Sequence, residues 1–156
     1  AAVSTHVGSA VAVLREQGTL ATVINVFIET NRFREQDLQY HGSKSTALAY
    51  PSSDTLQFNQ LAMQLLNDIY KPGYLYKKAG VMLAGIETNA RLQTDLFAQQ
   101  DSPERKKLMQ TLDALNNRYG RGTVQLATAM QSKDWRMCRE KLSPAYTTRP
   151  GAWMVG

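Results

Sequence analysis

Side chains that could catalyse a reaction are few in this sequence and do not cluster. The acidic residues are scattered over expected helix surfaces and loops, whereas a two-metal phosphoryl-transfer site needs carboxylates brought together to hold its ions. His6 and His41 have no Cys or Asp partner at the spacing of a metal site. We therefore expect no catalytic centre, no metal and no other cofactor in this chain.

Two short motifs look reactive but have simpler explanations. Cys138 lies between Met137 and Arg139, and a neighbouring Arg can activate a thiol; a buried structural thiol explains the residue more simply. The Gly-Arg-Gly at 120–122 is too short for a phosphate-binding loop and lacks the Lys-Ser/Thr pair of such loops. A single cysteine cannot form an internal disulfide, which fits a reducing cytoplasm.

Side chains suited to binding an anion are easier to find. Lys77 and Lys78 lie in the middle of an expected strand, so we expect one to face the helices and the other to face the open side of the sheet. Long cations, short hydroxyls and backbone amides suit phosphate oxygens, although a solvated sheet face explains the same residues. The other candidates lie on the neighbouring strand or in the loop before it: Arg32, Arg34, Lys44, Ser45 and Thr46.

The positive charge of the chain is concentrated in its second half. Residues 1–86 hold 7 Lys and Arg against 6 Asp and Glu, whereas residues 87–156 hold 11 against 7. This excess suits a polyanion or an acidic protein partner, and a solvated surface explains it equally well.

Nothing in the sequence predicts a membrane protein or a secreted one. No apolar run approaches the ~18 residues of a membrane-spanning helix, and no basic-then-apolar leader is present. The chain starts with Ala1-Ala2 inside an expected helix, which indicates a piece of a longer protein.

The elements that would position these side chains follow from hydrophobic periodicity. Apolar residues between Val3 and Leu14 recur at steps of four and three, which predicts a helix ended by Gly18. Residues 19–33 are rich in β-branched residues that alternate with a period of two, which predicts a strand. Residues 41–51 are its expected hairpin partner, after a polar loop of about ten residues, and Pro51 should end that strand.

A second helix and a third strand complete the expected first domain. Asp54 should cap a helix, with Gln57 completing a capping box, and the apolar stripe runs from Phe58 to Ile69. The third strand is expected at 74–86. The fold class is therefore α+β, with two helices on one face of an antiparallel sheet. One further strand before the first helix would complete a split βαβ arrangement, and this chain lacks it.

The second half begins with a polar connector at 87–101, which contains the apolar pair Leu96-Phe97. That pair could bind a partner or dock on its own domain. Ser102 and a following Pro predict the start of a helix, whose expected apolar stripe is Leu108, Leu112, Leu115 and Tyr119. Residues 123–130 form an apolar run that we interpret as a short strand. The basic, aromatic remainder completes a small mixed extension.

Three ordered stretches resemble a known family. YKKAGVML (76–83), RLQTDLF (91–97) and EKLSPAYTTR (140–149) are similar to the C-terminal part of UmuC/MucB-type proteins. These are Y-family translesion polymerases, the catalytic subunit of the damage-induced bacterial DNA polymerase V. The resemblance covers nearly the whole chain.

The resemblance implies a division of the chain into three parts. Residues 1–86 would be the little finger, a DNA-gripping domain, without its first strand. Residues 87–101 would be a linker, and residues 102–156 an extension implicated in contacts with a UmuD-type accessory dimer. The palm with its Mg²⁺-binding carboxylates would lie upstream. This piece would then be no enzyme, although its parent would be a DNA-directed DNA polymerase of the bacterial cytoplasm.

The connector resembles the family's motif for binding the β sliding clamp. Gln93, Asp95, Leu96 and Phe97 match its form, and Thr94 stands where Leu is frequent. An extended peptide could insert the two apolar side chains into a pocket while Gln93 fixes the register.

The resemblance also supports a DNA-binding interpretation of the sheet, because little fingers contact duplex phosphates with its open face. Lys77 and Lys78 match the basic pair of the family's last strand; Arg32, Lys44, Ser45 and Thr46 are placed by the hairpin alone. An alternative is that the chain mainly docks the accessory dimer, with Trp135 and Trp153 as anchors or as core residues. A third alternative, an independent enzyme, conflicts with the scattered carboxylates.

Overall fold

The computed structural model describes residues 1–88, 102–130 and 135. The first of these ranges folds as a helix, a hairpin, a second helix and a third strand. Among the described residues the strands form one three-stranded antiparallel sheet in the order β2-β1-β3. The elements are α1 (Ala2–Glu16), β1 (Thr19–Thr30), β2 (His41–Ser52), α2 (Thr55–Ile69) and β3 (Tyr76–Thr88).

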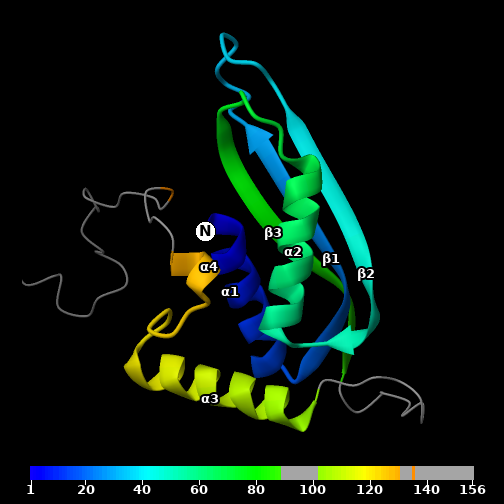
Figure 1. Cartoon of the computed structure of the whole chain (residues 1–156), viewed down its shortest axis with the longest axis vertical. Coiled ribbons are helices and arrows are strands. Elements are labelled where there is room, and N and C mark those ends of the chain that lie inside the picture. The colour runs from blue at the N-terminus through cyan, green and yellow to red at the C-terminus, as the bar shows by residue number, and fades with distance from the viewer. Residues whose placement is uncertain (89–101, 131–134, 136–156) are drawn as a thin grey trace, which may run out of the picture.

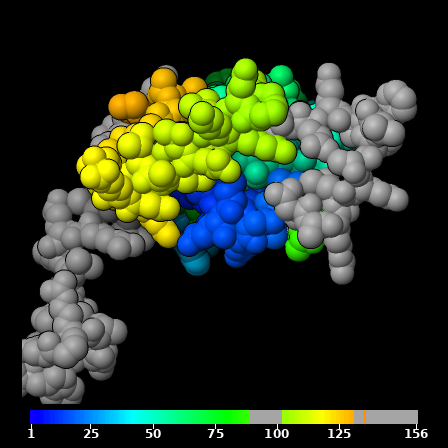
Figure 2. Space-filling view, turned by 90° about the horizontal axis from the view of Figure 1, so that it is seen from below, coloured from blue at the N-terminus to red at the C-terminus, as the bar shows by residue number. Residues whose placement is uncertain are grey.

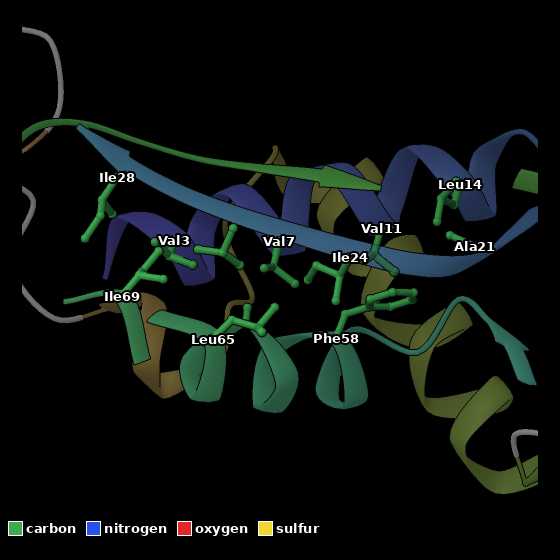
Figure 3. Close-up of a cluster of buried hydrophobic side chains, with 12 residues drawn as sticks. Val3, Val7, Val11, Leu14, Ala21, Ile24, Ile28, Phe58, Leu65 and Ile69 are labelled. Atoms are coloured by element: carbon green, nitrogen blue, oxygen red, sulfur yellow. The ribbon is translucent and has the colours of Figure 1, made fainter. Parts of the chain in front are cut away.

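The core lies between one face of the sheet and the two helices α1 and α2 (Figure 1). Ile24 and Ile28 of β1 point toward the helices (Figure 3), and Ile24 is fully buried. The helices contribute residues at steps of three and four, as the sequence predicts: Val3, Val7, Val11 and Leu14 from α1, and Phe58, Ala62, Leu65 and Ile69 from α2. The predicted α+β fold, with two helices on one sheet face, is confirmed.

The start of α2 differs from the predicted capping box. Asp54 is the N-cap, and its Oδ1 accepts a hydrogen bond from the backbone N–H of Leu56 at 2.8 Å. The N–H of Asp54 donates to Ser52 Oγ at 3.0 Å, so the reciprocal bond from Gln57 is replaced. The Gln57 amide instead lies 3.5 Å from the hydroxyl of Tyr50. The second carboxylate oxygen of Asp54 does not take part in the cap and pairs with Arg105 instead.

Strand β2 continues past the residue expected to end it. It runs through Pro51 to Ser52, and Ser52 pairs with Ala21 across a register shift between Ala21 and Val23. Because β2 is an edge strand and the ladder is irregular there, a proline without an N–H donor is tolerated.

A third helix, α3 (Pro103–Tyr119), lies across the ends of α1 and α2 (Figure 1). Figure 2 shows its yellow surface beside the blue residues of the N-terminal part of the chain. Arg105 Nη1 lies 2.8 Å from Asp54 Oδ2, and Asp113 makes two bonds to the Arg15 guanidinium at 2.6 and 2.7 Å. The residue of α3 that is buried between these ion pairs is Met109.

The apolar stripe predicted for α3 is therefore only partly correct. Leu108 is 51% exposed and Tyr119 is 62% exposed, whereas Leu112 is half-buried. The reason is that ion pairs hold α3 to Arg15, in the last turn of α1, and to Asp54, the N-cap of α2. Its packing face consists of Arg105, Met109 and Asp113, spaced by four residues.

The strand expected at 123–130 is wrong. Val124 exchanges two hydrogen bonds with the Asn116 side chain, at 2.9 and 3.0 Å. The chain then forms a short helix, α4 (Ala127–Met130), which lies against α1 (Figure 1). Thr128 accepts a bond from Asn59 at 3.2 Å and Ala129 is buried. The apolar residues of this segment are buried by packing against α1, so they do not need to pair with a strand to be buried.

Candidate nucleic-acid interface

The sheet face turned away from the helices carries a row of polar side chains on β1 and β2. Asn25 pairs with Ser45 across the two strands. Its amide donates to Ser45 Oγ at 2.8 Å and to Ser43 Oγ at 3.0 Å. Ser45 thus lies where the sequence predicts. Asn25 and Ser43 were not among the candidates predicted from the sequence. Ser43 lies two residues from Ser45 on the same strand, and Asn25 lies opposite Ser45 on the neighbouring strand, so the period of two could have found both.

Lys44 and Thr46 do not lie on this face. They pair with Val26 and Ile24, which are fully buried under the helices, and paired residues share a face. Lys44 Nζ reaches over the sheet edge to Asp68 of α2 at 2.8 Å. The expectation that residues 44, 45 and 46 act together on the open face is therefore wrong, because three consecutive strand residues cannot share one face.

Phe27 and Gly80 face each other in the middle of the open face. The Phe27 ring lies over Gly80 so closely that a Cβ at this position would overlap it. Only glycine fits under the ring. Further along β3 this face carries an apolar side chain, since Met82, the partner of Asn25, is 60% exposed.

A carboxylate organises the cationic end of the open face. Glu29 Oε1 lies 2.9 Å from Lys78 Nζ, and its Oε2 lies 3.2 Å from Arg32 Nη2 and 3.5 Å from His41 Nδ1. The Glu29 side chain is 11% exposed, whereas those of Lys78 and Arg32 are 67% and 71% exposed. The hydrogen bond from Lys78 is the main cause that lowers the pKa of Glu29, against the opposing effect of burial. The carboxylate therefore stays ionised and holds the cations in place.

An irregularity in the ladder brings both lysines to one site. Lys78 pairs with Glu29 and Tyr76 pairs with Thr30, which leaves Lys77 as an extra residue in β3. Both lysines line a surface hollow that Arg32 also lines. A bulge breaks the regular alternation of side chains here, so the predicted placement of the two lysines on opposite faces stays a prediction.

Three of the seven predicted anion-binding residues thus lie together, whereas Arg34, Lys44, Ser45 and Thr46 do not line the same hollow. Arg32, Lys77 and Lys78 share the hollow at one end of the open face. Ser45 lies further along the same face with Asn25. The clamp-motif residues Gln93, Asp95, Leu96 and Phe97 lie outside the described residues, as do Cys138 and Trp153.

The described part of the chain contains no group of His, Cys, Asp or Glu side chains that could hold a metal ion. Within the same residues, no helix has both the length and the apolar character needed to cross a bilayer. The site consists of cations, side-chain hydroxyls, an amide and the ion-paired carboxylate of Glu29, and its cations can bind an anion.

Sequence comparison assigns the chain to a family. Residues 1–96 match the impB/mucB/samB family C-terminal domain. The chain belongs to the impB/mucB/samB family. Residues 106–151 of this impB/mucB/samB chain match a second domain, described as a domain of unknown function (DUF4113).

Similar proteins cover the chain almost completely. Protein UmuC of Salmonella typhimurium is 35% identical over 95% of the chain and 35% of its own length, and protein SamB of the same organism is 36% identical over the same shares. DNA polymerase IV of Pelotomaculum thermopropionicum is 27% identical over 56% of the chain and 21% of its own length. The resemblance to UmuC/MucB-type proteins is confirmed. The chain spans about a third of the length of these first relatives, and no solved structure matches it.

Proposed function

We propose that this chain is the DNA-binding and clamp-binding C-terminal module of an error-prone translesion DNA polymerase that acts in SOS mutagenesis. The observation that carries the proposal is the cationic end of the open sheet face, where Lys77, Lys78 and Arg32 surround one hollow. The name of the relative DNA polymerase IV and the match to the impB/mucB/samB C-terminal domain support it.

The proposed grip is sequence-independent. Lysine and arginine side chains contact phosphate oxygens and thereby neutralise them, and side-chain amides and hydroxyls such as those of Asn25 and Ser45 add neutral donors. None of these groups needs to read a base edge. A polymerase that copies past damaged bases requires this tolerance, because the template base at the lesion is abnormal.

The proposed division of labour follows the chain. Residues 1–86 grip the duplex, residues 87–101 carry the clamp-binding peptide Gln93, Asp95, Leu96 and Phe97, and residues 102–156 form the extension. Nucleotide transfer, with its Mg²⁺ ions, belongs to the palm of the parent polymerase. This module holds the polymerase on its substrate and does not itself catalyse the reaction. It works in the bacterial cytoplasm, at DNA.

The first test is the double substitution Lys77→Ala with Lys78→Ala. If the parent chain neutralises about 3 phosphates, its affinity for primed duplex should fall with salt with a logarithmic slope near −2.7, and the loss of two lysines should reduce that slope by about 1.8. Fluorescence anisotropy at several salt concentrations measures both affinity and slope.

Lys106→Ala with Lys107→Ala is the matched control for this test. It removes an adjacent pair of lysines with the same charge from the exposed surface of α3. We expect this control to bind DNA as the parent does. Salt-independent binding of the parent chain would refute a phosphate grip.

A second candidate function is a platform that docks a UmuD-type accessory dimer. It is favoured by the exposed apolar side chains of Leu108, Leu115 and Tyr119, which recur on one face of α3, and by the 10 Lys and Arg against 4 Asp and Glu in residues 103–156. If the 106–107 pair rather than the 77–78 pair controls DNA binding, the sheet contact is incidental and this second function is preferred. Because Arg105 and Asp113 hold α3 on the first domain, these point substitutions test the question more cleanly than deletion of residues 101–156.

A further inference from the structure

The loop at 31–40, which joins β1 to β2, is held by its own hydrogen bonds. The Gln39 amide donates to the carbonyl oxygens of Asn31, Arg34 and Asp37, at 3.2, 2.8 and 3.1 Å. The side chain of Asn31 in turn accepts the backbone N–H of Phe33 at 3.1 Å. One amide group thus ties three carbonyls together and gives the loop a defined shape, at the end of the molecule opposite to α3 (Figure 1).

This ordered loop presents an aromatic ring to water. Phe33 is 94% exposed, the most exposed of the large apolar side chains in the described residues. Single exposed apolar side chains are ordinary on protein surfaces, so exposure alone indicates nothing. Its neighbours are what distinguish Phe33. It stands between Arg32 and Arg34 in sequence, and it lines the same hollow as Lys77 and Lys78.

A phenyl ring among cations differs from them in what it can contact. The lysines and arginines can bind phosphate oxygens, but the ring has no polar atom and gains free energy only by covering another apolar or aromatic surface. On a nucleic acid that surface is the face of a base. Stacking on a base tolerates any sequence, since every base has such a face.

We propose that Phe33 stacks on a nucleobase that has left the regular duplex stack, so that the loop at 31–40 senses unpaired or distorted DNA beside the phosphate grip. This inference rests on the proposed DNA-binding function and adds a contact to it. Arg32, Lys77 and Lys78 would draw the backbone to the hollow, and the ring would then hold an extrahelical base. Intact duplex offers the ring no free base face unless a step is unstacked, which is unfavourable.

The test compares Phe33→Ala and Phe33→Trp with the parent chain on two DNA duplexes, one intact and one with a single bulged 2-aminopurine. Phe33→Ala should weaken binding to the bulged duplex by about 5- to 150-fold, the range of one lost base stack. Its salt slope should stay unchanged, because no charge is lost. Phe33→Trp should restore the affinity, and the fluorescence of the introduced tryptophan should be quenched by the stacked base. Melting temperatures should agree among the three chains, since the ring is exposed.

Tyr119→Ala is the matched control, because Tyr119 is also an exposed aromatic beside an arginine, Arg118, on α3. It should bind both duplexes as the parent does. Equal affinity of Phe33→Ala and the parent for the bulged duplex would overturn the inference, as would an equal loss of affinity for the intact and the bulged duplex. If Lys77→Ala with Lys78→Ala still lowers the salt slope in that case, the proposed DNA grip stands and only the base contact fails.

Discussion

At the scale of single residues, Glu29 has the most consequences for the proposed interface. A carboxylate on a surface meant for phosphates should repel them, yet Glu29 is nearly buried among Lys78, Arg32 and His41. Its position fixes cations that would otherwise move freely on long side chains. Sequence reasoning found the cations and missed the acid, because the pairing of Glu29 with Lys78 depends on a register that no local pattern predicts.

Glu29→Gln should change how stability depends on pH. The pKa of Glu29 is lowered in the folded chain, so its contacts stabilise the fold above the ordinary pKa of glutamate and are lost as the pH falls through the lowered value. The difference in unfolding free energy between the parent and Glu29→Gln should therefore be largest at neutral pH and shrink in acid. Urea unfolding at a series of pH values measures it.

Glu35→Gln is the control for this comparison, because Glu35 is an exposed acid in the adjacent loop. Its difference from the parent should be small at every pH. If the two substitutions gave the same pH profile, the ion cluster around Glu29 would not be the cause.

At the scale of elements, the sequence predicts what periodicity can encode. The helices α1 and α2 and the three strands follow from steps of three and four and from alternation. Contacts between distant segments are not encoded in this way. The bulge at Lys77 depends on pairing with β1, and the docking of α3 depends on two ion pairs to residues 51 and 98 positions away in the sequence. The helical form of residues 127–130 likewise depends on packing against α1.

Arg105→Ala should destabilise the first domain although it lies in α3. Asp54 is 1% exposed, one of its oxygens caps α2, and the other is bonded to Arg105. Removal of the guanidinium leaves a buried carboxylate oxygen without its partner, which costs about 1–3 kcal/mol. Thermal and urea unfolding, followed by circular dichroism, measure the loss.

Arg118→Ala serves as its control, because Arg118 is exposed near the other end of the same helix. Its effect should stay within about 0.5 kcal/mol, as for most surface substitutions. Equal effects of the two substitutions would mean that the contact from α3 to Asp54 does not stabilise α2.

At the scale of the whole molecule, the proposed function combines two weak attachments. In this proposal the sheet would grip phosphates at one end of the first domain, and the connector at 87–101 would carry the clamp-binding peptide. Burial of Leu96 and Phe97 in a clamp pocket would stabilise by roughly 3–6 kcal/mol, less the cost of ordering the peptide. Neither proposed contact would be strong alone, but DNA binding would place the peptide near a clamp on the same duplex and raise its effective concentration. A weak double attachment suits a polymerase that must copy past a lesion and then leave.

Leu96→Ala with Phe97→Ala should abolish binding to the β sliding clamp and leave the melting temperature unchanged, because the pair is proposed to serve a partner and not the core. On primed DNA loaded with clamp, this variant should bind no better than on DNA without clamp, whereas the parent should bind more tightly when the clamp is present. Leu92→Ala, a neighbouring leucine outside the motif, should behave as the parent does. A fall of several degrees in the melting temperature of the double variant would instead place the pair in the folded interior and remove the tether from the proposed function.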